Sequence, residues 1–330
     1  MKKLLFLMIL TILFSCDTAE DYHNQGLSNY KLGNYNEAIN DFNKSIDLNP
    51  NNANTFYLRG HTETLLKNYN EAIDDFNKAI ELSPSEVIFY IGNGNAKVIL
   101  EDYYGAIAEY TKAIDLNPDY ARAYNLRGVS KAKLKDFNRA IDDFNKAIEL
   151  KPDYANAYHN RGVSKTKLKD YYEAIADFNN AIDLSPDYAE AYYYRGISKK
   201  KLGRSFSSDY NKAIELNPNY IDAYYKRGNL KDSLKDYYGA IADFTKAIEL
   251  EPDYADAYYN RGDSKAKLKD YFGAIDDFTV AIELKPDYAD AYYHRGNSKK
   301  ELGKLYCSDY DIACQLGEPI SCEQYNFYCK

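Results

Sequence analysis

The sequence predicts an all-α solenoid, a stack of nine helix-turn-helix units closed by a C-terminal capping helix. Two observations carry this prediction. The prolines of the 330-residue chain recur mostly every 34 residues, and each interval holds two segments with small and aromatic residues at helical spacing. A single helical hairpin cannot bury both of its packing faces, so such units must stack on their neighbours. The nine prolines are Pro50, Pro84, Pro118, Pro152, Pro186, Pro218, Pro252, Pro286 and Pro319.

The unit at residues 255–288 shows how each hairpin is built. Its residues for packing lie three or four positions apart, which places them on one face of each helix. Glycine and alanine there allow the two backbones to approach closely, and the aromatic side chains fill the remaining space. Asp270 is expected to cap the second helix, and Asp287 the first helix of the next unit. The residues of the pattern are Tyr258, Gly262, Ala274, Phe278, Ala281 and Pro286.

This pattern resembles the tetratricopeptide repeat, over about residues 19–316. The resemblance implies a right-handed α-solenoid whose first helices line a concave wall, with unit positions 2, 5, 9 and 12 facing inward. It also implies that this wall binds other proteins. The family's groove for a C-terminal carboxylate needs Lys and Asn at inward sites, and these units lack that set. A receptor for chaperone tails is therefore not expected.

The N-terminus resembles a bacterial lipoprotein signal. A basic start, MKK, precedes the apolar run Leu4–Phe14. This run is shorter than the roughly 20 residues that a membrane-spanning helix needs, and it suits a cleaved secretory signal. The run ends in Leu13-Phe14-Ser15-Cys16, which resembles a lipobox, although Phe14 departs from the usual smaller residue.

By this resemblance, residues 1–15 are removed and Cys16 is acylated, palmitate being one such acyl group. Residues 16–18 then form the lipid anchor and a short tether. The expected location is the bacterial cell envelope, on a periplasmic or surface face, with the choice of leaflet open. The alternative is an ordinary cleaved signal followed by an incidental cysteine.

Two charged positions recur along the repeat. Unit position 7 is arginine in seven units, and position 23 is acidic in all nine. Because guanidinium groups bind carboxylates through two parallel hydrogen bonds, we predict a ladder of partly buried ion pairs between helices. Solvated charges that merely repeat are the alternative. The arginines are Arg59, Arg127, Arg161, Arg195, Arg227, Arg261 and Arg295. The acids are Asp41, Asp75, Glu109, Asp143, Asp177, Asp209, Asp243, Asp277 and Asp309.

Two units, residues 189–220 and 289–316, are shortened in the turn and second helix. They read LGRSFSSDYNKA and LGKLYCSDYDIA, and they lie 100 residues apart. Residues 121–220 and 221–320 therefore look like tandem copies of a three-unit block. We predict a local break in the superhelical path centred on Gly203 to Ser208.

Four cysteines lie in the last 24 residues, where residues 317–330 are expected to form a capping helix. Cys307 and Cys314 are seven residues apart, as are Cys322 and Cys329, and both sets are symmetric about residue 318. A helical hairpin turning there predicts two disulfides, Cys307–Cys329 and Cys314–Cys322. Zinc is the alternative. Sulfurs two helical turns apart, about 10 Å, are too distant for one tetrahedral site, and an exported protein meets oxidants.

Composition excludes several classes of function. The chain has 42 Lys and Arg against 50 Asp and Glu, a formal net charge of −8. Nucleic-acid binding is not expected from that balance, and net charge would not draw the protein to an anionic lipid surface. The four histidines form no ligand pair, so neither catalysis, a metal site nor a cofactor is expected. They are His23, His61, His159 and His294.

Carried onto this chain, the inward positions of the last four units make a tyrosine-rich, acidic groove. Such a wall suits extended protein segments that carry Lys or Arg together with apolar side chains. The upstream wall differs, with apolar Ile88, Ile91 and Val129 and basic Arg122. The alternative is that the tyrosines only reflect a tyrosine-rich composition. The predicted groove residues are Glu190, Tyr193, Asp222, Tyr225, Asn229, Asp256, Tyr259, Asp263, Asp290, Tyr293 and Asn297.

These features together predict a lipid-anchored, non-enzymatic scaffold or adaptor of the bacterial envelope that binds protein segments in its groove. One alternative is a structural subunit of an envelope assembly or secretion machine. Another is a lipoprotein that recognises glycan or peptidoglycan through its tyrosines.

Overall fold

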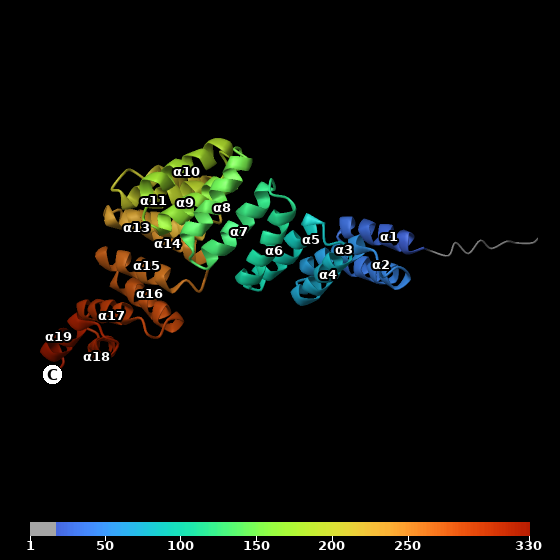
Figure 1. Cartoon of the computed structure of the whole chain (residues 1–330). Helices are drawn as coiled ribbons and strands as arrows, with labels where there is room; N and C mark the ends of the chain where they lie inside the picture. Colours follow the sequence, from blue (N-terminus) through green and yellow to red (C-terminus); the bar gives the residue numbers. More distant parts are fainter. Residues whose placement is uncertain (1–17) are drawn as a thin grey trace, which may run out of the picture. The chain divides into compact units, whose positions relative to one another are not determined.

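The computed structural model describes residues 18–330; the predicted signal and Cys16 lie outside the described residues (Figure 1). From Thr18 to Lys330 the chain forms nineteen α-helices and no strand. Eighteen of these helices make nine consecutive helix-turn-helix pairs, and α19 follows as a cap. The all-α fold predicted from the proline spacing is therefore confirmed.

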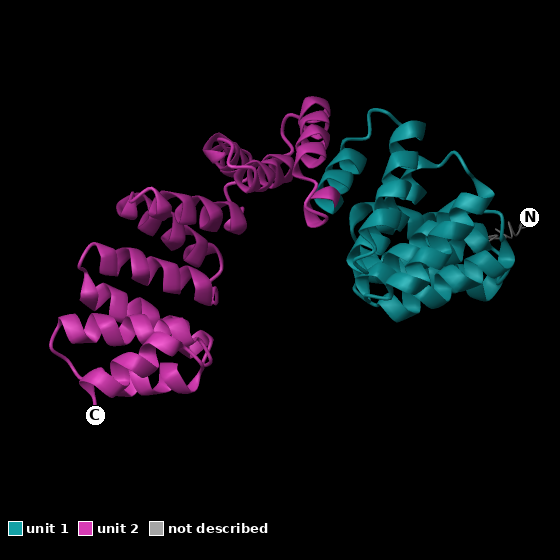
Figure 2. Ribbon diagram, turned by 60° about the vertical axis from the view of Figure 1, so that its left-hand side comes forward, with its two compact units in different colours: residues 1–164 teal, residues 165–330 magenta. Residues whose placement is uncertain are grey.

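The chain divides into two compact units, residues 1–164 and 165–330, coloured separately in Figure 2. Unit 1 contains α1 (Ala19–Leu32), α2 (Tyr35–Leu48), α3 (Ala53–Leu65), α4 (Tyr69–Leu82), α5 (Val87–Ile99), α6 (Tyr103–Leu116), α7 (Ala121–Lys133) and α8 (Phe137–Leu150). The helix α9 (Ala155–Lys167) crosses the division. Unit 2 contains α10 (Tyr171–Leu184), α11 (Ala189–Lys201), α12 (Ser207–Leu216), α13 (Ile221–Ser233), α14 (Tyr237–Leu250), α15 (Ala255–Lys267), α16 (Tyr271–Leu284), α17 (Ala289–Glu301), α18 (Cys307–Gln315) and α19 (Pro319–Tyr328).

Close approach between the helices of a pair depends on glycine. In the α15–α16 pair, a Cβ built on Gly262 would lie 3.0 Å from Cε1 of Phe278. The ring of Phe278 and the flanking Ala274 and Ala281 are fully buried. The aromatic ring therefore fills the space that the missing side chain leaves, as the sequence pattern predicted.

The structure confirms one of the two predicted helix caps and corrects the other. Asp270 is the N-cap of α16, and its Oδ1 accepts a hydrogen bond of 3.0 Å from the backbone N–H of Gly273. The N-cap of α17 is Tyr288, which makes no side-chain cap. Asp287 lies one residue earlier, where its backbone carbonyl accepts from the N–H of Ala289 at 3.0 Å. The prediction for Asp287 was wrong because a tight backbone turn begins the helix there.

The predicted arginine–carboxylate ladder is confirmed. The guanidinium group of Arg261 donates to both oxygens of Asp277, at 3.0 and 2.7 Å, and Asp277 is only 3% exposed. Arg161 donates to Asn145 at 2.7 Å. The same arginine-to-acid pairing within a hairpin joins Arg59 to Asp75, Arg127 to Asp143, Arg195 to Asp209, Arg227 to Asp243 and Arg295 to Asp309.

Six buried acids of this ladder, from Asp143 onward, also bind a lysine, which sequence reasoning missed. Lys265 lies one helical turn after Arg261, and its Nζ is 2.7 Å from Asp277 Oδ2. The remaining donor of Arg261, Nη1, reaches back to the hydroxyl of Thr245 in the preceding pair, at 3.1 Å. One guanidinium group therefore joins both helices of its own hairpin to the hairpin before it.

The shortened units lose residues at the start of their second helix. The helix α12 has 10 residues and α18 has 9, whereas most second helices have 14. In both units a glycine with positive φ, Gly203 or Gly303, makes the turn. Phe206 and Tyr306, the N-cap residues, pack edge-on against Tyr210 and Tyr310 of the shortened helix.

The C-terminal cap is joined to the last hairpin by two disulfides. The structure bonds Cys307 to Cys329, with the Cα atoms 5.7 Å apart, and Cys314 to Cys322, with the Cα atoms 4.7 Å apart. This is the pairing that the symmetric spacing predicted. Within residues 18–330, no helix has the length and apolar character that crossing a bilayer requires.

Candidate partner-binding surface

The predicted groove residues belong to the first helices of the last four pairs, α11, α13, α15 and α17, all in unit 2. Together we call them the tyrosine–carboxylate face. Its members are Glu190, Tyr193, Asp222, Tyr225, Asn229, Asp256, Tyr259, Asp263, Asp290, Tyr293 and Asn297.

Three of the four tyrosines of this face are packed in pairs. The ring of Tyr225 lies 4.9 Å from that of Tyr254, and the ring of Tyr259 lies 4.9 Å from that of Tyr288. Tyr193 makes the same contact, at 4.9 Å, with the tyrosine that precedes α13. The second ring of each pair comes from the last residue before the next hairpin, so each pair joins neighbouring repeats.

Sequence reasoning missed these second rings, Tyr220, Tyr254 and Tyr288. They lie outside the helices, at the N-cap positions of α13, α15 and α17. The signal that could have found them is the DY or NY that directly follows six of the nine prolines.

Packing between repeats limits the tyrosine surface that a partner could contact. Tyr193 is 5% exposed, whereas Tyr225, Tyr259 and Tyr293 are half-buried. Burial raises the pKa of Tyr225 above its ordinary value, and the charge of Asp256 adds to this effect. The half-buried rings therefore form an apolar surface, and the phenol of Tyr225 stays protonated at neutral pH.

The carboxylates lie beside these rings and remain accessible. Glu190, Asp222 and Asp290 are exposed, and Asp256 is half-buried. The charge of Asp222 contributes to the raised pKa values of Tyr193 and Tyr220, after the larger effect of burial. The charge of each of these four carboxylates therefore acts on at least one tyrosine of a ring pair. A carboxylate beside an aromatic ring suits the ammonium or guanidinium group of a partner.

The polar residues at position 9 are partly engaged within the fold. Asn297 accepts a hydrogen bond of 2.7 Å from the hydroxyl of Tyr310. Asp263 binds Lys267 at 2.8 Å and lies 3.9 Å from Nδ1 of His294. Burial lowers the pKa of His294, while the charges of Asp263 and Asp290 oppose that shift. Asn229 forms a hydrogen bond with Tyr225.

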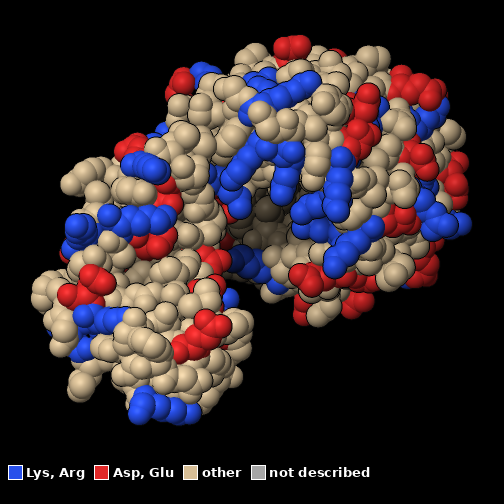
Figure 3. Space-filling model, turned by 90° about the vertical axis from the view of Figure 1, so that its left-hand side faces the viewer, with Lys and Arg blue, Asp and Glu red and all other residues tan. Residues whose placement is uncertain are grey.

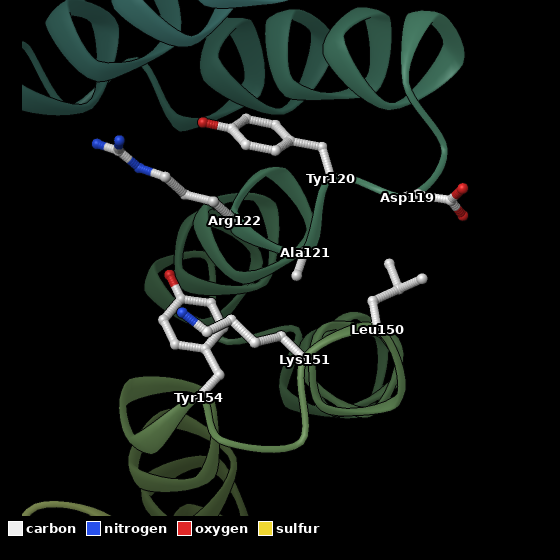
Figure 4. Close-up of a pocket in the computed structure, with 7 residues that line it drawn as sticks. All are labelled: Asp119, Tyr120, Ala121, Arg122, Leu150, Lys151 and Tyr154. Atoms are coloured by element: carbon white, nitrogen blue, oxygen red, sulfur yellow. The ribbon is translucent and has the colours of Figure 1, made fainter.

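Unit 1 contains a basic cavity, in contrast to the acidic tyrosine–carboxylate face of unit 2. Its volume is about 450 Å³, and Figure 4 shows its lining side chains. The exposed Arg122 and Lys151 make it basic, and the ammonium of Lys151 lies 5.3 Å from the ring centre of Tyr154. The charge of Arg122 also acts on Tyr57, His61 and Tyr110. The lining residues are Asp119, Tyr120, Ala121, Arg122, Leu150, Lys151 and Tyr154.

Within residues 18–330, no group of three or more His, Cys, Asp or Glu side chains is arranged to hold a metal ion. The tyrosine–carboxylate face offers carboxylates, phenols and aromatic surface. That chemistry supports recognition of cations and apolar side chains.

Comparison with protein-family models gives matches along most of residues 26–303. A model described as "Tetratricopeptide repeat" matches residues 53–86, 121–154 and 221–254, and another with the same description matches residues 244–276. A model described as "TPR repeat" matches residues 26–63, 94–135, 164–203 and 262–303. Comparison with curated proteins gives no match.

Solved structures of helical-repeat proteins are similar to this chain. The crystal structure of MamA protein is 26% identical, with 53% of this chain and 95% of that chain covered and a TM-score of 0.48. That of YrrB, "a TPR protein with an unusual peptide-binding site", is 27% identical, with 56% and 96% covered and a TM-score of 0.47. A tetratricopeptide repeat protein from Parabacteroides merdae ATCC 43184 is 17% identical, with 85% and 98% covered and a TM-score of 0.54. The last of these agrees with the helical-repeat fold.

Proposed function

The chain belongs to the tetratricopeptide repeat family, and from that premise we propose that it is a membrane-anchored scaffold of the bacterial cell envelope. Repeat proteins of this family bind other proteins. In this proposal Cys16 carries the lipid anchor, and the tyrosine–carboxylate face binds extended segments rich in Lys or Arg. The protein brings partners together and performs no chemistry on them.

The observation that supports this specificity is the position of the exposed acids beside paired rings. Glu190, Asp222 and Asp290 recur at the second position of their helices, each close to a tyrosine pair. Charge complementarity of this kind favours a basic partner and steers its approach. The half-buried rings add apolar contact area at little entropic cost.

The test is binding of a fluorescent peptide of alternating lysine and leucine, measured by anisotropy, with a glutamate-for-lysine peptide as comparison. The triple variant Asp222→Asn, Asp256→Asn and Asp290→Asn should weaken binding of the lysine peptide at least tenfold. Asparagine keeps the shape of aspartate and removes only its charge. Alanine at the tyrosines is less suitable, because those rings also pack between repeats.

The matched control removes the same charge elsewhere in unit 2. Glu215→Gln, Glu249→Gln and Glu283→Gln neutralise exposed acids of the second helices and should leave affinity unchanged. Equal losses in both triple variants would show nonspecific attraction to an acidic protein and would overturn the proposed site. Binding of a soluble peptidoglycan fragment, with none of the lysine peptide, would favour the glycan alternative. Binding of neither probe would favour a structural subunit.

The lipid anchor has a separate test. Mass spectrometry of protein from its native membrane should show residue 16 as the first residue, carrying acyl chains. A chain that begins elsewhere, or an unmodified Cys16, would contradict the anchor and leave the peptide-binding result intact.

A further inference from the structure

The turns between the first and second helices of unit 2 form an edge rich in cations. We call it the basic turn edge, and it comprises residues 165–172, 199–206, 231–238, 265–272 and 299–306. In Figure 3, basic side chains gather in groups on the face that is shown. Exposed cations of this edge include Lys167, Lys169, Lys201, Arg204, Lys235 and Lys269.

The same edge exposes large apolar side chains. The exposed fraction rises from 41% for Leu168 to 94% for Leu305. Three aromatic rings in the first turn of second helices are also more than half exposed. Monomeric proteins rarely gather such side chains without a binding role. The six exposed apolar residues are Leu168, Tyr172, Leu234, Tyr238, Phe272 and Leu305.

Contacts join the first of these turns to the second, and the third, fourth and fifth to one another. The guanidinium of Arg204 lies 4.8 Å from the ring centre of Tyr172 in the preceding pair. The ammonium of Lys304 lies 4.4 Å from the ring centre of Phe272. Lys267 binds Asp232 of the preceding turn at 2.6 Å.

Acidic side chains are present on this edge but leave an excess of cations. Asp232 is bound by Lys267, while Asp236 and Asp270 accept hydrogen bonds from the N-terminal backbone of their helices. Asp170 and Glu301 are exposed. A separate group of exposed acids in unit 2 lies at the other end of the second helices, at Asp183, Asp187, Glu215, Glu249, Glu251 and Glu283. The two edges therefore carry opposite charge although the whole chain is acidic.

We propose that the basic turn edge of unit 2 binds an anionic phospholipid surface. Lysine and arginine beside exposed leucine and tyrosine fit the headgroup region, where cations contact phosphates and apolar side chains enter the acyl boundary. Nucleic acid is less suited to this edge. Cations already lie over the rings of Tyr172 and Phe272, and exposed leucines have no counterpart on a phosphate backbone.

The test uses a tryptophan reporter, because the chain contains no tryptophan. Leu305→Trp places the indole at the most exposed apolar position of the edge. The full chain is mixed with vesicles of phosphatidylcholine containing phosphatidylglycerol, and with vesicles of phosphatidylcholine alone. We expect a blue shift of the emission, and quenching by brominated acyl chains, with the phosphatidylglycerol vesicles only.

The matched reporter is Leu284→Trp, at the acidic end of α16. It lies about 20 Å along the helix from the basic turn edge, from the rise of 1.5 Å per residue. This reporter should not shift. The comparison isolates the edge, because attachment through residues 1–17 would be the same in both chains.

Charge variants give a second measurement. Lys201→Gln, Lys235→Gln and Lys269→Gln should each weaken vesicle partition about fivefold. Lys285→Gln, on the opposite edge, should not. The proposal is overturned if the emission of the tryptophan at position 305 does not shift with the phosphatidylglycerol vesicles, or if the tryptophans at positions 305 and 284 shift alike. It is also overturned if soluble single-stranded DNA gives the same emission shift as the vesicles. The peptide-binding face is not involved, so failure here leaves the proposed function standing.

Discussion

Replacing Asp277 with alanine tests whether the arginine ladder holds the repeats together. Asp277 is 3% exposed and accepts three charged hydrogen bonds, at 2.7 and 3.0 Å from Arg261 and at 2.7 Å from Lys265. Its loss would leave two cations without an acceptor at a site where the arginine side chain is 16% exposed. Breaking a buried ion pair costs about 3–5 kcal/mol. Because both cations are partly exposed to solvent, we expect Asp277→Ala to lower the free energy of unfolding by about 3 kcal/mol, the lower end of that range.

The neighbouring residue supplies the control. Asp276 lies on the same helix and is exposed, so Asp276→Ala should change stability by less than about 0.5 kcal/mol. Urea unfolding followed by circular dichroism compares the two variants. Hydrogen exchange of α15 and α16 shows whether the loss is local, as expected for a repeat protein. Equal stability of the two variants would refute the argument that the ladder stabilises the stack.

Three further predictions concern packing, pH and the cap. Gly228→Ala should cost about 2 kcal/mol in urea unfolding, because its Cβ would lie 2.7 Å from Cε1 of Phe244; an unchanged midpoint would contradict this. Burial raises the pKa of Tyr210 to about 12, so ionisation opposes folding and stability falls as pH rises from 10 to 12, by about 1.4 kcal/mol per pH unit. Tyr210→Phe should make that alkaline decline less steep, and an identical pH profile for both proteins would show that Tyr210 does not contribute to it. Non-reducing peptide mapping of exported protein should link Cys314 to Cys322, whereas four free thiols would contradict the stapled cap.

Much of the fold could be predicted because equivalent contacts recur in successive repeats. Gly262 and Phe278 share a fixed separation with equivalent residues in other units, and so do Arg261 and Asp277. The two residues of a contact within one hairpin are separated by the same number of positions in most units, so the repeated residue pair can be recognised in the sequence. The disulfides followed from a symmetric spacing about one turn, which is also a local relation.

The features that sequence reasoning missed lie between hairpins or in the turns. Tyr254 packs against Tyr225, 29 positions earlier, and no helical periodicity relates the two. Asp287 appeared suited to cap a helix, but the backbone turn that precedes α17 sets the boundary one residue later. The basic turn edge was hidden by the net charge, because its lysines are scattered along the sequence and only stacking brings them together.

The backward reach of the arginines has a consequence for how such a chain can change length. Arg227 donates to Asn211 of the hairpin before it, at 2.9 Å, and Arg127 donates to Thr111 at 3.2 Å. Excising residues 121–220 would seat Arg227 against Thr111, an acceptor already used for the same purpose. Because this arginine finds an acceptor on either preceding hairpin, recombination can add or remove a whole three-unit block without losing the hydrogen bond between hairpins. Such a gene can change the number of repeats in its protein while each arginine keeps its hydrogen bond to the preceding hairpin.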